Sequence, residues 1–217
     1  MIGRLTSRRA ILITLVCIIS VFSVALFITI NVSPWFISHP GSLQVSRNGI
    51  NSDYRRLLAY LELPGSRLVL EQMPLTAAAR GHFADVKRYL LLNELVMVVS
   101  TSAACILLQK EKRRQQLWQL LSPLAWGMSI LAVILTMMAV ILTMMLVDFP
   151  SLFITSHYWL FAKMDWVLNP RVDPIILLMP LSFFTELFIV WVSLVFFFLA
   201  VLWGYLHFAT GLTKFRL

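Results

Sequence analysis

The chain has 217 residues, of which 59% are hydrophobic and only 13% are charged. Soluble domains carry about 25% charged residues, so this composition excludes an ordinary water-soluble fold and predicts a membrane protein. The formal net charge is +8, but the basic residues are not interleaved with solvent-facing aromatic residues. Nucleic acid is therefore not an expected partner.

Four stretches are apolar enough to cross a hydrocarbon core of roughly 30 Å at about 1.5 Å per helical residue. The first follows three arginines and has no convincing cleavage site, so we interpret it as an uncleaved anchor. We predict an all-α integral membrane protein with a single membrane domain, 1–217, and four transmembrane helices. The expected spans are residues 10–31, 90–109, 117–147 and 187–213.

The basic residues predict the orientation of these spans, because cytosolic loops carry an excess of Lys and Arg. The N-terminal piece, the loop 110–116 and the C-terminal piece together hold nine Lys or Arg and one acid, whereas the rest of the chain holds nine of each sign. These three pieces share one side if all four segments span. We therefore expect both termini in the cytosol.

Two segments, 32–89 and 148–186, are then extracytoplasmic and are predicted to rest on the outer leaflet as small helical or loop segments. In the first, Asn51-Ser52-Asp53 offers a helix N-cap before an apolar face, and Thr76 can cap a helix that continues into the second span. The apolar face has the helical spacing i, i+3, i+4, i+7 at Tyr54, Leu57, Leu58 and Leu61.

The second outer segment contains a turn-rich patch, 165–174, between an aromatic run, 158–161, and an apolar run, 175–184. Aromatic residues prefer the headgroup level, so this loop is expected to lie close to the membrane. The apolar run is broken by Pro180 and is too short to span. We expect it to form an interfacial or re-entrant helix, or the top of the fourth span.

Two histidines meet near one plane in this topology, since His82 precedes the second span and His157 follows the third. Asp85 lies one turn from His82, close enough to orient its ring or raise its pKa, which is a pattern for a general base. A hydrogen-bonded surface pair is the alternative reading. We expect His39 to be an ordinary loop residue and His207 to bond between helices.

Other chemistry has weaker support. Two histidines and a carboxylate suit zinc, so a metal held by His82, Asp85 and His157 is an alternative, but their spacing is not diagnostic. Ser156 beside His157 is a second alternative, as a nucleophile, although the sequence has no Gly-x-Ser-x-Gly elbow. We expect no metal and no other cofactor.

The segment Gly81-His82-Phe83-Ala84-Asp85-Val86-Lys87, with the later His157, resembles the bacterial lipoprotein intramolecular transacylases. The family's first motif reads approximately His-x-x-Asp-Val-Lys. Its looser second motif is matched in part downstream of the second histidine, at Asp165-Trp166, Pro170, Asp173, Pro180 and Phe183-Phe184. The chain departs from the family pattern at Ser156, Asn169 and Leu181.

The resemblance implies an acyltransferase of the bacterial cell membrane with its active site at the outer leaflet. Its substrate would be a lipoprotein whose N-terminal cysteine carries a diacylglyceryl group. The sn-2 acyl chain would move to the α-amine of that cysteine and give an N-acyl lyso-form lipoprotein, without an external acyl donor. One histidine would be the general base, for which we favour His157, while His82, oriented by Asp85, would relay a proton or stabilise the oxyanion. The roles of the two histidines can also be the reverse.

The resemblance also suggests residues that support the site or bind substrate. Lys87 and Arg171 are candidates to anchor a headgroup or a negative charge, although both can equally snorkel at the interface. Trp166 is a candidate to line an acyl groove, with an aromatic residue of the interfacial belt as the commoner alternative. Asp173 is a further candidate for substrate binding, with a structural ion pair as its alternative role.

Two other functions remain open on the sequence. The chain can be a non-enzymatic membrane subunit whose outer face binds a partner, or a metal-dependent membrane hydrolase.

Overall fold

The computed structural model describes residues 2–113, 148 and 150–214, without the side chains of residues 2–7, 207 and 209–214. All the regular secondary structure in this part of the chain is helical, which confirms the predicted fold class. The expected third span, 117–147, lies outside the described residues, as does the side chain of His207. The chain divides into two units, which are residues 1–25, 95–142 and 192–217, and residues 26–94 and 143–191.

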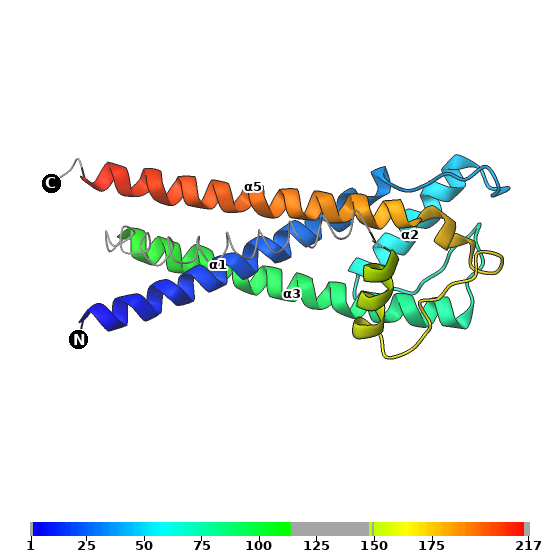
Figure 1. Cartoon of the computed structure of the whole chain (residues 1–217), viewed down its shortest axis with the longest axis horizontal. Helices are drawn as coiled ribbons and strands as arrows, with labels where there is room; N and C mark the ends of the chain where they lie inside the picture. Colours follow the sequence, from blue (N-terminus) through cyan, green and yellow to red (C-terminus); the bar gives the residue numbers. More distant parts are fainter. Residues whose placement is uncertain (1, 114–147, 149, 215–217) are drawn as a thin grey trace. The chain divides into compact units, whose positions relative to one another are not determined.

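Three long helices dominate the described chain, namely α1 (Ile2–Val32), α3 (Ala77–Arg113) and α5 (Leu181–Lys214) (Figure 1). Each is long and apolar enough to cross a membrane, over Arg8–Trp35, Ala77–Arg113 and Leu181–Leu206. The first, second and fourth expected spans are thus helices of sufficient length.

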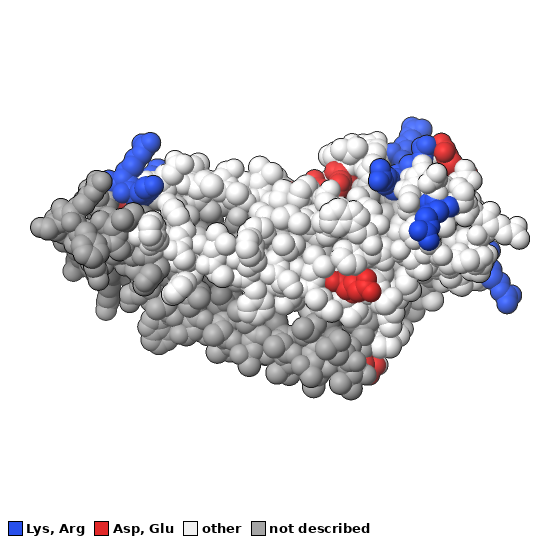
Figure 2. All heavy atoms as spheres, turned by 90° about the horizontal axis from the view of Figure 1, so that it is seen from above, with Lys and Arg blue, Asp and Glu red and all other residues white. Residues whose placement is uncertain are grey.

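Only part of α3 is apolar enough to lie in the hydrocarbon core of a bilayer. Its 37 residues would measure about 55 Å, which exceeds the roughly 30 Å of a bilayer core. The helix has no charged residue between Glu94 and Lys110, whereas several precede Glu94. The first turns of α3, which contain His82, therefore lie outside the membrane-spanning segment. Figure 2 shows a long uncoloured stretch along the described helices on the face that it draws.

In the first unit the three long helices pack through a small apolar cluster. Its buried residues are Ala10, Ile13, Cys17, Ala104 and Leu206. Small side chains such as Ala10 and Ala104 allow helix backbones to approach closely, which favours association in lipid. The hydroxyls of Ser20 and Thr101 are 2.7 Å apart and share a hydrogen bond between α1 and α3. Such a bond satisfies both polar groups within an apolar segment.

The second unit contains the two outer segments, which share one hydrophobic core. It includes η1 (Ser33–Trp35), α2 (Arg47–Glu62), a helical segment at 150–160, and η3 (Pro174–Leu178). Buried residues from both segments belong to the same cluster, among them Tyr54, Leu57, Ile175 and Leu178. The predicted apolar face of α2 is confirmed, because Tyr54 and Leu57 are buried and Leu58 and Leu61 are half-buried.

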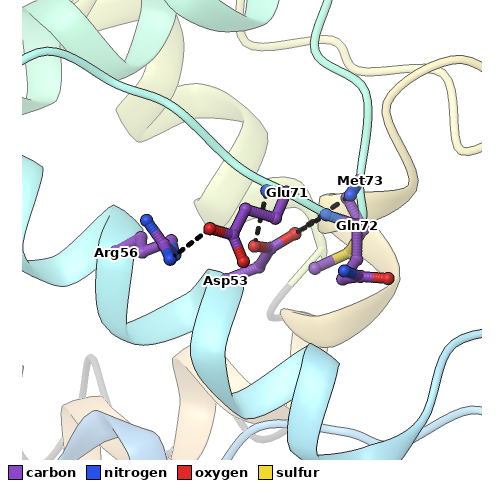
Figure 3. Close-up of polar contacts among 5 residues, drawn as sticks. All are labelled: Asp53, Arg56, Glu71, Gln72 and Met73. Carbon is purple, nitrogen blue, oxygen red and sulfur yellow. Dashed lines mark hydrogen bonds and ion pairs between the residues drawn. The ribbon is translucent and has the colours of Figure 1, made fainter.

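The expected start of α2 at Asn51-Ser52-Asp53 is wrong. The helix begins at Arg47 because the Ser46 hydroxyl accepts a hydrogen bond from the Gly49 backbone N–H at 3.1 Å. The expected capping residues serve other contacts. The Asn51 amide oxygen lies 2.9 Å from His39 Nε2, and the Asp53 carboxylate bonds with the backbone of residues 71–73 (Figure 3).

The apolar run 175–184 forms two elements. Pro174 opens the short helix η3, and Pro180 directly precedes α5. Proline has no N–H to donate, so it is tolerated at a helix start. This run is therefore the short helix η3 followed by the first turn of the last long helix.

The carboxylate of Asp53 holds a loop that has no regular secondary structure. It accepts hydrogen bonds from the backbone N–H groups of Glu71, Gln72 and Met73 at 2.8, 2.8 and 2.9 Å (Figure 3). Asp53 is 0% exposed, so its charge depends on these three donors for stabilisation. In the same view Arg56 and Glu71 form an ion pair near the surface.

We expect Asp53→Asn to lower the free energy of unfolding by about 3 kcal/mol, since an amide nitrogen would face a backbone N–H and the charge would be lost. Arg56→Ala is the control, because an exposed ion pair contributes less than about 1 kcal/mol. Unfolding of the detergent-solubilised protein, followed by its thermal midpoint, measures both. Equal midpoints for the two variants would contradict the role assigned to Asp53.

Candidate active site

The second unit encloses a cavity of about 230 Å³. Most of its wall is apolar and comes from α2, α3, the segment 150–160 and α5. Five side chains with polar atoms also line it, namely Ser33, Tyr54, His82, His157 and Trp166. Ligand pockets commonly combine an apolar wall with a few polar groups that orient the ligand. The cavity is therefore the candidate active site.

The two histidines lie together at this cavity, with ring centroids 6.1 Å apart. Phe161 contacts both rings, at 4.7 Å from His82 and 5.4 Å from His157. The Tyr89 hydroxyl donates a hydrogen bond of 2.6 Å to the Leu160 carbonyl, which joins α3 to the end of the segment 150–160. The helices that carry the two histidines are thus tied together close to the rings.

His157 is fixed in one tautomer. Its Nδ1 lies 2.8 Å from the Phe153 carbonyl oxygen, which can only accept, so the neutral ring carries its proton on Nδ1. Its Nε2 then holds a lone pair that can take a proton. Burial lowers the pKa of His157, while the bond to Phe153 raises it by less. A neutral ring with an available Nε2 suits a general base.

His82 has a more apolar environment. Burial and the neighbouring His157 lower the pKa of His82 to about 4, although Asp85 and Asp165 act in the opposite direction. Its Nδ1 is buried without a hydrogen-bond partner among the described residues. Both rings are therefore neutral near pH 7.

Asp85 and Lys87, the expected supporting residues, use their charged groups elsewhere. The Asp85 carboxylate accepts a 2.8 Å hydrogen bond from Arg88, so its effect on His82 is electrostatic. Lys87 Nζ donates to the Leu63 carbonyl and to the Ser66 hydroxyl, each at 2.7 Å. Lys87 thereby holds the chain that follows α2.

The three candidates for substrate binding have different positions. Trp166 lines the cavity, with its ring 4.9 Å from that of His157. Arg171 is exposed on the loop. Asp173 is buried and accepts hydrogen bonds from the Thr76 N–H at 2.7 Å and from its hydroxyl at 2.9 Å. As predicted, Thr76 caps α3, since its Oγ1 accepts from the Ala79 N–H at 3.2 Å.

Two features of the site were not predicted from the sequence. Tyr54 lines the cavity and donates a 2.8 Å hydrogen bond to the Ser33 hydroxyl, whereas the apolar spacing of α2 identified it only as a core residue. Gly81 is the second, because a Cβ there would lie 2.9 Å from the Asp165 carboxylate. Its place directly before His82 in the motif is the signal in the sequence that points to it.

The remaining expectations concern residues at the edge of the site. His39 bonds with Asn51 and does not line the cavity. The Ser156 hydroxyl donates to the Phe153 carbonyl at 2.8 Å. Within residues 2–113, 148 and 150–214, no three His, Cys, Asp or Glu side chains are grouped closely enough to hold a metal ion, so Asp85 does not complete a ligand set with the histidines.

The family model of the lipoprotein intramolecular transacylase Lit matches residues 10–184. The chain belongs to this family. It is therefore a membrane acyltransferase, a lipoprotein intramolecular transacylase. A search of curated protein sequences found no match to this chain.

Solved structures of Lit from Bacillus cereus share the fold. One is 22% identical, covers 99% of this chain and 98% of its own, and has a TM-score of 0.78. Two variants in which a histidine is replaced by arginine or by alanine are 19% identical, with TM-scores of 0.76 and 0.75. They cover 100% and 99% of this chain and 95% and 96% of their own. This likeness shows that the transacylase has the fold of known membrane-integral Lit structures.

We expect Gly81→Ala to lower transacylase activity by up to roughly tenfold, because the added Cβ would lie 2.9 Å from Asp165 Oδ2 and this side chain, next to Trp166, would have to move. Gly41→Ala is the matched control, since a Cβ at Gly41 meets nothing within 4 Å. The double variant Gly81→Ala with Asp165→Gly removes the clash and should recover activity relative to Gly81→Ala alone. Steady-state rates of the purified proteins measure this, and additive losses in the double variant would contradict the steric explanation.

The lowered pKa of His82 makes stability dependent on pH. Between pH 6.5 and about 4 the unfolded chain binds a proton at His82 that the folded protein does not, so the free energy of unfolding falls as the pH falls. We expect the thermal midpoint to drop between about pH 7.5 and about pH 5, and to drop less in His82→Asn. An equal drop of the thermal midpoint in both proteins would show that the folded protein does not lower the pKa of His82.

Proposed function

We propose that this transacylase moves the sn-2 acyl chain of a diacylglyceryl lipoprotein to the α-amine of its N-terminal cysteine. The observation that carries the proposal is a pair of neutral imidazoles, 6.1 Å apart, at one apolar cavity. Transfer from an ester to an amine needs a base for the ammonium proton and an acid for the leaving alkoxide. Two imidazoles can supply both without a cofactor.

The reaction is balanced within one substrate molecule. The ammonium first releases one proton to solvent. The neutral amine nitrogen then forms a bond to the sn-2 ester carbon, while the π electrons move to the carbonyl oxygen and the nitrogen gives a second proton to the base. The bond from that carbon to the glycerol oxygen then breaks, and the glycerol oxygen takes the proton. The products are an amide and a free glycerol hydroxyl on the same lipoprotein.

The geometry supports different roles for the two histidines. His157 is the general base, because its Nδ1 proton is held by the Phe153 carbonyl and its Nε2 has a free lone pair. His82 relays the proton toward the glycerol oxygen, and its buried Nδ1 has no competing partner among the described residues. Asp85 contributes only through its charge, since its carboxylate bonds with Arg88.

The cavity wall suits a lipid substrate. Leu57, Leu61, Phe83 and Phe183 form part of an apolar surface on which acyl carbons exclude water. We place this site at the outer leaflet, with both termini in the cytosol, on the basis of the Lys and Arg distribution. Arg171, exposed on the loop, is then available to a lipid headgroup.

The test uses a bacterial strain that lacks other lipoprotein N-acylation, with mass spectrometry of the N-terminal lipopeptide. The wild-type chain should leave the total number of acyl chains unchanged and move one to the amine. We expect His157→Gln and His82→Asn each to reduce this conversion at least about 100-fold, since general acid–base groups contribute 10²–10⁴. His39→Gln, outside the cavity, is the control.

Two results would contradict the proposal. Conversion retained in both histidine variants would exclude the two-histidine mechanism. An unmodified diacylglyceryl peptide despite properly inserted wild-type protein would exclude the transfer itself and favour a subunit that binds a partner.

A further inference from the structure

The polar groups that line the cavity differ in whether the protein satisfies them. The Tyr54 hydroxyl donates to Ser33 Oγ, and the Ser33 hydroxyl donates in turn to the Ile30 carbonyl. His157 Nδ1 bonds with the Phe153 carbonyl. Among the described residues, two buried nitrogen atoms of the lining have no partner, which are His82 Nδ1 and Trp166 Nε1.

An unpartnered buried N–H is costly, so such a group in a native protein requires an explanation. Trp166 Nε1–H can only donate, and it cannot be relieved by a change of tautomer as an imidazole can. The indole ring packs 4.9 Å from the His157 ring and 5.5 Å from that of Tyr158, which fixes its position at the cavity. Its missing partner is therefore a hydrogen-bond acceptor, and because the nitrogen itself is buried, a substrate oxygen reaches it by entering between the rings that line the cavity.

We propose that the Trp166 indole N–H donates a hydrogen bond to the oxygen of the migrating acyl carbonyl and stabilises it as negative charge develops. This role rests on the proposed transfer of the sn-2 chain. When the amine nitrogen bonds to the ester carbon, the π electron pair moves to this oxygen, and it returns when the bond to the glycerol oxygen breaks. A donor already in place gains strength at the moment of charge development and needs no reorganisation.

The position of the donor is set by contacts outside the cavity. A Cβ at Gly81 would lie 2.9 Å from Asp165 Oδ2, so the Trp166 loop approaches the first turns of α3 at this point. The loop supplies Trp166 and the segment 150–160 supplies the base, His157, so the two side chains lie at one cavity. A carbonyl carbon attacked by an amine near His157 has its oxygen within the same small volume.

The test replaces the N–H and keeps the ring. Trp166→3-benzothienylalanine, introduced at that single codon in the full-length protein, substitutes sulfur for the indole N–H with almost unchanged shape. On a synthetic diacylglyceryl-cysteine lipopeptide we expect kcat to fall about 100-fold while KM changes less than about threefold, as for loss of one oxyanion donor. The same analogue at Trp159, which is 88% exposed, should leave kcat near the wild-type value.

A second variant separates the N–H from the ring. Trp166→5-fluorotryptophan keeps the donor and makes it slightly more acidic, so kcat should be retained or rise. Wild-type activity in the benzothienyl protein, or an equal loss in both ring variants, would overturn the role of the N–H. Absence of transfer by the wild-type protein on this lipopeptide would instead refute the proposed function.

Discussion

The hydrogen bonds between Asp173 and Thr76 join the two chain segments on which the site depends. Thr76 caps α3, which carries His82 two turns later, and Asp173 ends the loop that carries Trp166. Asp173 is buried, so its carboxylate is stable only while both Thr76 donors are present. A helix start and a loop 97 residues apart in sequence are thereby fixed to each other. The aromatic and imidazole rings at the cavity are held in place because the Asp173–Thr76 and Asp53 hydrogen bonds restrain the loops of this unit.

The membrane explains why the chemistry is concentrated in the second unit. Hydrocarbon tolerates backbone polar groups only when they are bonded internally, which helices achieve and irregular loops do not. The first unit accordingly consists of helix segments in the part that is described, with a hydroxyl pair between Ser20 and Thr101. Loops that can aim several side chains at one reacting atom are found in the second unit, where Asp53 and Asp173 supply acceptors for their N–H groups.

The sequence predicted the features that depend on composition and local spacing. The long apolar runs predicted three of the described helices, and the spacing of Tyr54 and Leu57 predicted the buried face of α2. The order of the spans also brought His82 and His157 to one place. The choice among competing partners could not be predicted. Ser46 caps α2, and Asp85 bonds with Arg88 three residues later, because several donors and acceptors lie within reach of each group. The bonds from Thr76 to Asp173 join residues 97 positions apart, so no local pattern shows them.

Burial has two opposing effects on each of the two histidines. It lowers their pKa values, which weakens each ring as a base but keeps it in the unprotonated form that can accept a proton near pH 7. The same burial strengthens every hydrogen bond at the cavity, because few water dipoles screen it. A weak base in an apolar site can therefore drive the transfer if the developing charges are stabilised there. In the proposed mechanism, the hydrogen bond that His157 Nδ1–H donates to the Phe153 carbonyl would stabilise the imidazolium. The Trp166 N–H, which has no partner among the described residues, would stabilise the oxyanion. Each of the two opposite charges of the proposed reaction would thus have a protein group to stabilise it.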